Sequence, residues 1–209
     1  MAVLDLQVGA GADDAEEKDD GFNFSSIETL VVLHDNSNAA SRFNGGFRFL
    51  NVTVANANTI DLAYLSLNLD TTFFDDPNFN IHTENVDNAV SFVTTADVTS
   101  RARAASPVLW SALGVGTGFV NSPEIKTIIQ ARVNAAGWVS GNALVILCIP
   151  PGTTSQQFRA YTYDNDTTKA AKLHIEYTAG GGRIMGALAG PGGLAGPGGL
   201  AGRRGGIAG

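Results

Sequence analysis

Short segments in which apolar and polar residues alternate, separated by turn residues, fill the middle of the chain. The clearest segment, residues 59–69, places every second side chain on one apolar face: Ala63, Leu65, Leu67 and Leu69. Comparable segments lie at residues 26–34, 46–54, 78–85, 89–93, 143–149, 157–163 and 171–177. Roughly eight to ten short strands with turn signals between them predict an all-β fold, an antiparallel β-sandwich or jelly roll.

Residues 46–54 are interpreted as one continuous strand. Its alternation places Phe47 and Phe49 on one face and Leu50, Val52 and Val54 on the other. The strand would therefore present apolar side chains to both sides.

A single short helix is expected near residue 125. Ser122 can cap it, Pro123 suits the first helical position, and Glu124 lies where the helix dipole favours an acid. One apolar face follows, made of Ile125, Ile128, Ile129 and Val133, and Gly137 is a plausible stop. We expect this helix to pack on the sandwich with Trp138 beside it.

The first twenty residues are interpreted as an arm outside the main domain. Residues 2–8 alternate as a short strand, with Leu4, Leu6 and Val8 on one face and Val3 on the other. The acidic segment that follows, GAGADDAEEKDDG, is expected to be an unburied linker. An isolated strand must pair with something, so it pairs either with its own domain or with the sheet of a neighbour.

The chain divides accordingly into an arm (1–20), a β-sandwich domain (21–178) and a glycine-rich tail (179–209). Glycine recurs in the tail with a period of three, at Gly190, Gly193, Gly196, Gly199, Gly202 and Gly205. Such a period is typical of a collagen-like triple helix, in which only glycine fits at the axis. A disordered low-complexity tail and a tail that docks on a neighbouring subunit remain open.

Charge is unevenly distributed over the 209 residues, whose net charge is −7. The first twenty carry seven acids and one lysine, a net of −6, whereas the tail carries Arg183, Arg203 and Arg204 and no acid. Ends of opposite sign can attract each other head to tail between subunits, although salt screens that attraction. The acidic balance argues against nucleic-acid binding, and no apolar run is long enough to cross a membrane.

Candidate catalytic or metal-binding residues do not form a recognisable motif. His34, His82 and His174 lack ligand spacing and are interpreted as ordinary strand residues, and Cys148 as a small buried hydrophobe. Asp164-Asn165-Asp166 is interpreted as a plain turn in preference to a calcium site. The sequence therefore predicts no catalytic residue, no metal and no cofactor, and a polysaccharide lyase or hydrolase lacks its acid and base.

Several distributed motifs resemble a known family. They are RFLNV, the I60-x-x-A63-x-L65-x-L67 pattern, VLW around Trp110, PEIKTIIQARV, GWVSGNALVILCI and KLHIEY. Across residues 22–178 the chain resembles the DNRLRE-type jelly-roll modules, which are similar to carbohydrate-binding modules and occur in microbial surface proteins and phage structural proteins. The resemblance implies an antiparallel β-sandwich and, in some members, glycan binding. The arm and the tail are departures from a free-standing sugar-binding module.

We therefore expect a non-enzymatic structural subunit of a phage virion appendage, fibre or extracellular filament. Its partners would be further copies of itself, as a trimer or polymer, with other virion proteins or surface glycans as further candidates. The assembly residues would be Val3, Leu4, Leu6 and Val8 in the arm, the six glycines of the period, and Arg203 and Arg204. The N-terminus carries no recognisable secretory signal, so either the mature protein begins elsewhere or it leaves the cell by another route, as a virion protein released by lysis would. The alternative function is a glycan-binding module at a virion or cell surface.

Overall fold

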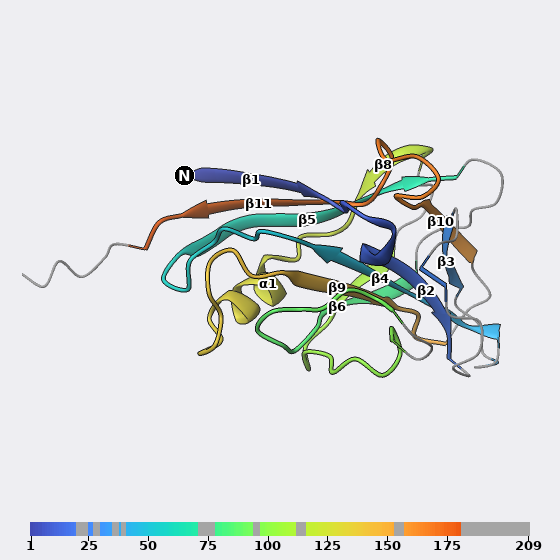
Figure 1. Ribbon diagram of the computed structural model, residues 1–209, viewed down its shortest axis with the longest axis horizontal. Coiled ribbons are helices and arrows are strands. Elements are labelled where there is room, and N and C mark those ends of the chain that lie inside the picture. Colours follow the sequence, from blue (N-terminus) through green and yellow to red (C-terminus); the bar gives the residue numbers. More distant parts are fainter. Residues whose placement is uncertain are drawn as a thin grey trace, which may run out of the picture.

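Eleven strands and one α-helix form the regular structure of the described part of the computed structural model (Figure 1). The described residues are 1–19, 25–26, 30–34, 38, 41–70, 78–93, 97–111, 116–152 and 157–180. The strands are β1 (Ala2–Gln7), β2 (Asp14–Lys18), β3 (Leu30–His34), β4 (Phe43–Phe49), β5 (Thr59–Leu69), β6 (Asn78–Thr83), β7 (Val108–Ser111), β8 (Gly118–Asn121), β9 (Leu144–Ile149), β10 (Gln157–Tyr161) and β11 (Lys172–Thr178). The helix α1 spans Lys126–Val133, and a 3₁₀ turn η1 spans Gly11–Asp13.

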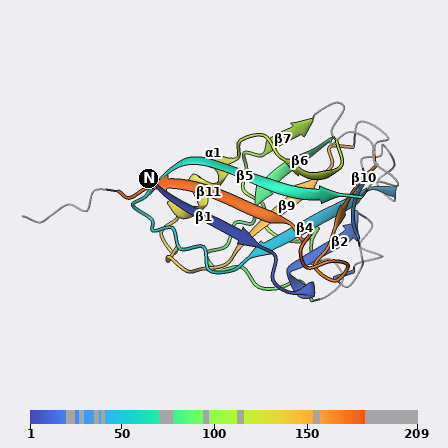
Figure 2. The same ribbon diagram turned by 90° about the horizontal axis from the view of Figure 1, so that it is seen from above.

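Two antiparallel sheets face each other, as the alternating sequence pattern predicted. The first sheet has the order β1-β11-β5, with β8 also paired to β5, and the second has the order β4-β9-β6-β7, with β2 also paired to β4. Strands β10 and β3 pair with each other at one end of the sandwich and link the two sheets, since β10 meets β5 and β3 meets β4. In both views, α1 lies toward the opposite end (Figures 1 and 2).

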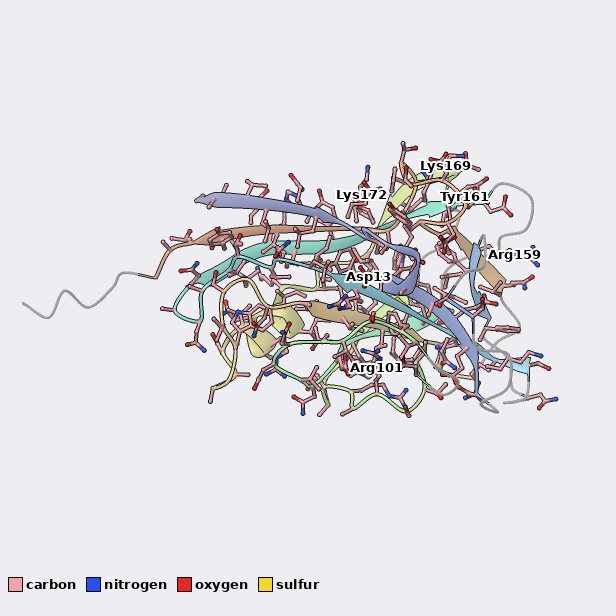
Figure 3. All side chains as sticks on the ribbon, viewed as in Figure 1. Asp13, Arg101, Arg159, Tyr161, Lys169 and Lys172 are labelled. Atoms are coloured by element: carbon pink, nitrogen blue, oxygen red, sulfur yellow. The ribbon has the colours of Figure 1, made fainter. Side chains whose placement is uncertain are left out.

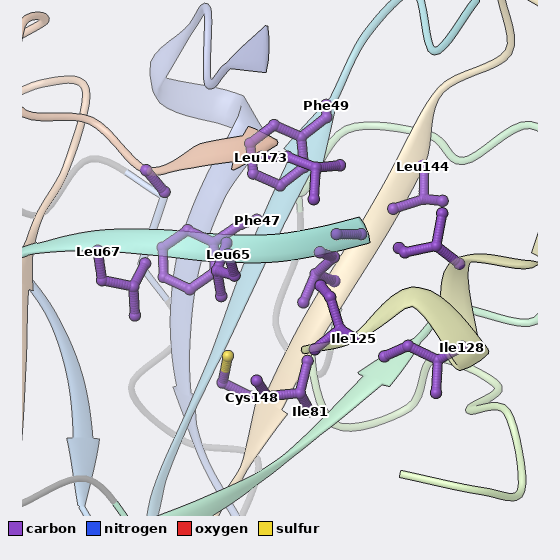
Figure 4. Packing of buried hydrophobic residues seen from close by; sticks show 14 of the residues in the cluster. Phe47, Phe49, Leu65, Leu67, Ile81, Ile125, Ile128, Leu144, Cys148 and Leu173 are labelled. Atoms are coloured by element: carbon purple, nitrogen blue, oxygen red, sulfur yellow. The ribbon is translucent and has the colours of Figure 1, made fainter. Parts of the chain in front are cut away.

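The main core fills the space between the sheets (Figure 4). The face of β5 predicted from alternation is confirmed, because Ala63, Leu65, Leu67 and Leu69 are all buried. A second, smaller core lies on the outer side of β4 and β9 under the segments 84–93 and 97–103, around Phe92 and Leu147. Strand β9 is thus covered on both faces, which explains why residues 143–149 are apolar without alternation.

The acidic segment after β1 is not an exposed linker, and that expectation was wrong. Residues 14–18 form β2, which pairs antiparallel with β4 and is buried except at Lys18. The acids there accept hydrogen bonds from backbone amides: Glu16 from Val32 (2.6 Å), and Glu17 from Val98 (2.9 Å) and Thr99 (2.8 Å). Hydrogen bonds from amides offset part of the cost of burying these acids, and composition alone does not reveal such donors.

The helix was predicted correctly in its apolar face but not in its ends. Ile125, Ile128, Ile129 and Val133 are buried in the main core. The helix begins at Lys126 because the backbone before it continues the pairing with β5, through the amides of Ser122 and Ile125. Ser122 does not cap the helix, since its hydroxyl accepts from Leu65 N (3.0 Å) and donates to Pro123 O (2.7 Å). The helix ends at Val133, before Gly137.

Residues 46–54 do not form one continuous strand. Strand β4 ends at Phe49, and Asn51 takes a positive φ of 55°. This left-handed residue reverses the alternation, so Val52 and Val54 enter the same core as Phe47 and Phe49. Asparagine is one of the few residues that adopt this conformation readily.

Residues 89–93 were also expected to be a strand and are not. They form part of the irregular segment over the second sheet, held by single backbone bonds such as Phe92 N to Ala12 O (2.8 Å). Ala89 and Phe92 are buried in the second core beside β9, whereas Val90 and Val93 are exposed.

Candidate functional site

The N-terminal strand β1 forms the outer edge of the first sheet (Figure 2). It pairs with β11 of its own chain, with Ala2 opposite Tyr177 and Gln7 opposite Lys172. Of the two pairings that the sequence left open, the structure contains the one within the chain.

The four residues predicted for assembly in this strand lie in three different environments. Val3 is 56% exposed on the outer face, Leu4 and Leu6 are half-buried against the main core, and Val8 is buried. Val8 therefore anchors the end of the arm, while Val3 is free for contact with another molecule. The predicted tail residues Gly190, Gly193, Gly196, Gly199, Gly202, Gly205, Arg203 and Arg204 lie outside the described residues.

The two ends of the described chain meet at one end of the molecule (Figures 1 and 2). Because β1 and β11 are antiparallel, the first residue of β1 lies beside the last residues of β11. The chain continues from there to Gly180, whose amide donates to the side chain of Asn58 (3.2 Å). The arm and the start of the tail are thus neighbours, although they are far apart in the sequence.

A groove of about 420 Å³ crosses the outer face of β1, β11 and β5. Residues of all three strands line it, with the polar ones at alternate positions: Asp5, Leu6, Gln7, Tyr64, Ser66, Lys172, Leu173 and His174. Its polar side chains are a carboxylate, an amide, hydroxyls, an ammonium and an imidazole. Together they supply both donors and acceptors in one open concave surface.

His174 is the best-connected side chain of the groove. Its Nδ1 lies 2.6 Å from Oδ1 of Asp5 and its Nε2 lies 3.3 Å from Oε1 of Glu176. The ring also stacks on Tyr64, with 4.6 Å between ring centroids. Burial of the imidazole acts to lower the pKa of His174, but the hydrogen bonds and charges of the two carboxylates outweigh it and raise the pKa above 6.5.

Lys172 lies at the other side of the groove and is labelled in Figure 3. Its Nζ lies 4.0 Å from the centroid of the Phe119 ring of β8, an aromatic residue that is partly exposed. Ser66 in the groove donates a hydrogen bond to Asn121 of the same strand β8. Strand β8 therefore holds the far wall of the groove through one cation–π contact and one hydrogen bond.

The other predicted candidates are structural in the described part of the chain. Burial raises the pKa of the Cys148 thiol, which lies in the main core without a disulfide partner. Nδ1 of His82 lies 2.9 Å from Ala104 O, and burial lowers the pKa of His82. Among the described residues, no group of three or more histidine, cysteine or acidic side chains could hold a metal ion. The side chain of His34 is not described.

The Asp164-Asn165-Asp166 segment is a turn, as predicted. Asp166 Oδ1 accepts from the Thr168 amide (2.9 Å) and hydroxyl (2.7 Å), and these bonds lower the pKa of Asp166. An aspartate that accepts from the second residue after it is the usual Asx-turn.

Several acids of the arm, which the sequence assigned to an exposed acidic head, lie inside the domain. Asp13, Asp14 and Glu17 are buried within the fold, and Asp13 is paired with Arg48 at 2.7 Å. Asp5 is the acid of the described arm that stands open to solvent, and it lies against His174. Most of the acidic side chains of the arm are therefore buried in the domain and not exposed for contact with another chain.

Comparisons with known proteins add no family assignment. No protein-family model matches the chain, and a search of curated proteins returns no significant match. The resemblance to DNRLRE-type modules stays a prediction. In the described residues, none of the helical structure has the length and apolar character to span a membrane.

Sequence reasoning missed the groove, because its residues come from three strands distant in sequence. Alternation did carry a weak signal: Asp5, Gln7, Tyr64, Ser66, Lys172 and His174 all lie at the polar positions of alternating strands. A polar face is also what a solvated sheet requires, so the pattern alone could not mark a site.

Proposed function

We propose that the chain is a structural subunit of a multimeric assembly, such as a virion appendage, a fibre or an extracellular filament. The sandwich is a rigid module in this proposal, and the subunit contacts are made by the terminal segments. No catalytic role is proposed for any residue.

The observation that carries this proposal is the position of the two ends. Strand β1 is an edge strand, and the chain leaves β11 toward the glycine-period tail at the same end of the molecule. Three-residue glycine periodicity is the packing pattern of a triple helix made by several chains. Two association elements side by side would let one end of the subunit contact its neighbours.

The test is the oligomeric state of a chain that lacks residues 181–209. This cut preserves β11 and the bond between Gly180 and Asn58. We expect the shortened chain to lose the higher assembly and to keep the thermal unfolding transition of the sandwich. A control chain with the tail glycines Gly193, Gly199 and Gly205 changed to alanine keeps the length and should lose the same assembly. Assembly that survives both changes would contradict a role for the tail.

The groove over β1, β11 and β5 favours a second candidate, a glycan-binding module. Hydroxyl-rich ligands need convergent donors and acceptors, and Asp5, Gln7 and Lys172 provide both beside the ring of Tyr64. A glycan array with the full chain tests it. Binding should be lost in Tyr64→Ala and kept in Leu109→Ala, whose side chain lies on β7, away from the groove. If no glycan binds selectively, the glycan-binding function is contradicted and the structural role is the candidate that remains.

A further inference from the structure

The free edge of β1 carries unpaired backbone groups. The amide of Val8 donates to Ala171 O (3.0 Å), which continues the register of β1 with β11. Because hydrogen bonds alternate along an antiparallel pair, the even residues of β1 bond to β11. Val3, Asp5 and Gln7 then direct their N–H and C=O groups outward, and these groups meet no partner in the described part of the chain.

This edge lacks the usual protection against strand pairing. Natural edge strands are protected by proline, lysine, a bulge or an inward charge. The sequence AVLDLQ contains neither proline nor lysine, its register with β11 is regular from Ala2 to Gln7, and its one charge, Asp5, lies against His174. Leu4 and Leu6 are only half-buried, so a further strand at this edge would complete their burial.

We propose that β1 pairs antiparallel with β1 of a second copy of this chain, with Leu4 opposite Leu4 at the two-fold axis. The pairing deepens the proposed function, on which it rests, by naming the contact of the arm. It joins the two first sheets into one continuous sheet across the interface. An isologous contact of this kind uses one surface twice and closes on itself.

The register follows from the outward groups and from the charge of Asp5. The outward backbone groups belong to the odd-numbered residues of β1. Hydrogen bonds between the two copies therefore require an odd-numbered residue of one β1 opposite an odd-numbered residue of the other. Placing Asp5 opposite Asp5 would bring two carboxylates together, which is unfavourable in a cross-strand pair. Placing Asp5 opposite Val3 of the second copy avoids this repulsion, and it puts Leu4 opposite Leu4 and Leu6 opposite Ala2 on the core side.

The geometry also sets the direction of the tails. In one copy the tail begins beside the first residue of β1. Since the two β1 strands are antiparallel, the two tails leave from opposite ends of the joined sheet. The dimer is then a two-ended unit, and the tails are free to join such units lengthwise.

Disulfide formation at the two-fold axis tests the pairing and its register in the full chain. Directly opposite residues of a non-hydrogen-bonded pair have Cα atoms about 4.5 Å apart, within the range of a disulfide. We expect Leu4→Cys to form a disulfide-linked dimer as the main product under mild oxidation. Val3→Cys is the matched control, because it keeps the charge of Asp5 that sets the register. In this register the two cysteines are offset by two residues, roughly 8 Å or more apart, and should stay unlinked.

A proline at the free edge provides the second test. Val3→Pro removes an outward N–H and leaves the bonds to β11 intact, whereas Val3→Ala keeps the N–H. The cross-linking rate of Leu4→Cys should fall at least about tenfold with Val3→Pro and little with Val3→Ala, because two interface bonds are lost.

Three results would overturn the pairing: cross-linking through Val3→Cys alone, a cross-linking rate of Leu4→Cys that Val3→Pro does not lower, or an assembled full chain in which Leu4→Cys does not link. The last result leaves the proposed function standing. A full chain that is monomeric and unlinked contradicts both.

Discussion

Nδ1 of His174 lies 2.6 Å from Oδ1 of Asp5, so the last strand of the fold holds the first through a side-chain contact as well as a backbone ladder. Glu176 faces the same imidazole from β11, and Tyr64 stacks on it from β5. Lys172, two residues before His174 in β11, also lines the groove. The contact fastens the arm most firmly when the imidazole is protonated.

The pKa shift of His174 predicts a pH-dependent stability. The folded-state pKa lies above 6.5, so the stabilisation is complete below pH 6.5 and is lost as the pH rises through the folded pKa. His174→Gln should lower the free energy of unfolding more at pH 6 than at pH 8, with a difference of up to about 1 kcal/mol for this exposed pair. Urea unfolding at the two pH values measures it, and an equal loss at both would contradict the ion pair.

Asp14 predicts a larger pH effect in the same direction. Burial raises the pKa of this carboxyl from 3.8 to about 7, against the hydrogen bond from the Tyr163 amide, and the charges of Asp164 and Asp13 add to the rise. Between these pKa values the folded chain keeps a proton that the unfolded chain has lost, so stability falls as the pH rises from about 4 to about 7.

Asp14→Asn should remove most of this dependence. The amide oxygen can still accept from Tyr163, and the side chain no longer ionises in a buried position. The variant should match the natural chain near pH 4 and exceed it near pH 8 by a few kcal/mol at most. Glu124→Gln, at an exposed position, is the control. A variant that is less stable than the natural chain at pH 8 would show that Asp14 is better ionised than neutral.

Arg101 is predicted to be the most costly side chain to remove from the segment over the second sheet. It is buried, donates to Glu84 (2.8 Å) and Asp97 (3.1 Å), and lies 4.2 Å from the ring centroid of Phe92 (Figure 3). Arg101→Met leaves Glu84 without its cation and should cost about 3–5 kcal/mol. Arg103→Met, at an exposed position, should cost little. Similar losses in chemical denaturation of the two variants would contradict this role.

Gly46 is predicted to tolerate no side chain. A Cβ placed there would lie 2.5 Å from Cζ of Phe92, in the second core. Gly46→Ala should destabilise the fold by about 1–3 kcal/mol through overpacking. Gly9→Ala is the matched control, because a Cβ at Gly9 meets nothing within 4 Å. Differential scanning calorimetry compares them, and an unchanged melting temperature of Gly46→Ala would show that Phe92 can move aside.

The sequence predicted those parts of the fold in which periodicity and burial coincide. Strand β5 was located to the residue, and the apolar face of α1 was identified, because each element has one buried side. Strand β2 escaped prediction since its buried residues are acids, whose amide partners come from loops and strands distant in sequence. The turn at Asn51 escaped because one positive φ reverses the alternation without any change in composition.

For the candidate site too, the sequence pointed to one part and did not mark the other. Val3 and Leu4 were predicted to be association residues because an alternating strand at a chain end needs a partner, and that role stays a prediction. The structure adds which backbone groups of the strand remain free. The groove around His174 was not foreseen. Its formation depends on the register that brings Asp5, His174 and Tyr64 side by side on three strands, and register between distant strands is set by the whole fold.

Self-association through the chain ends is tested most directly by the mass of the particle in solution. Sedimentation equilibrium of the full chain and of the chain ending at Gly180, over a wide range of concentrations, separates the two association elements. We predict an assembly larger than a dimer for the full chain and a concentration-dependent dimer for the shortened one. A full chain that sediments as a single folded copy at every concentration would contradict the account.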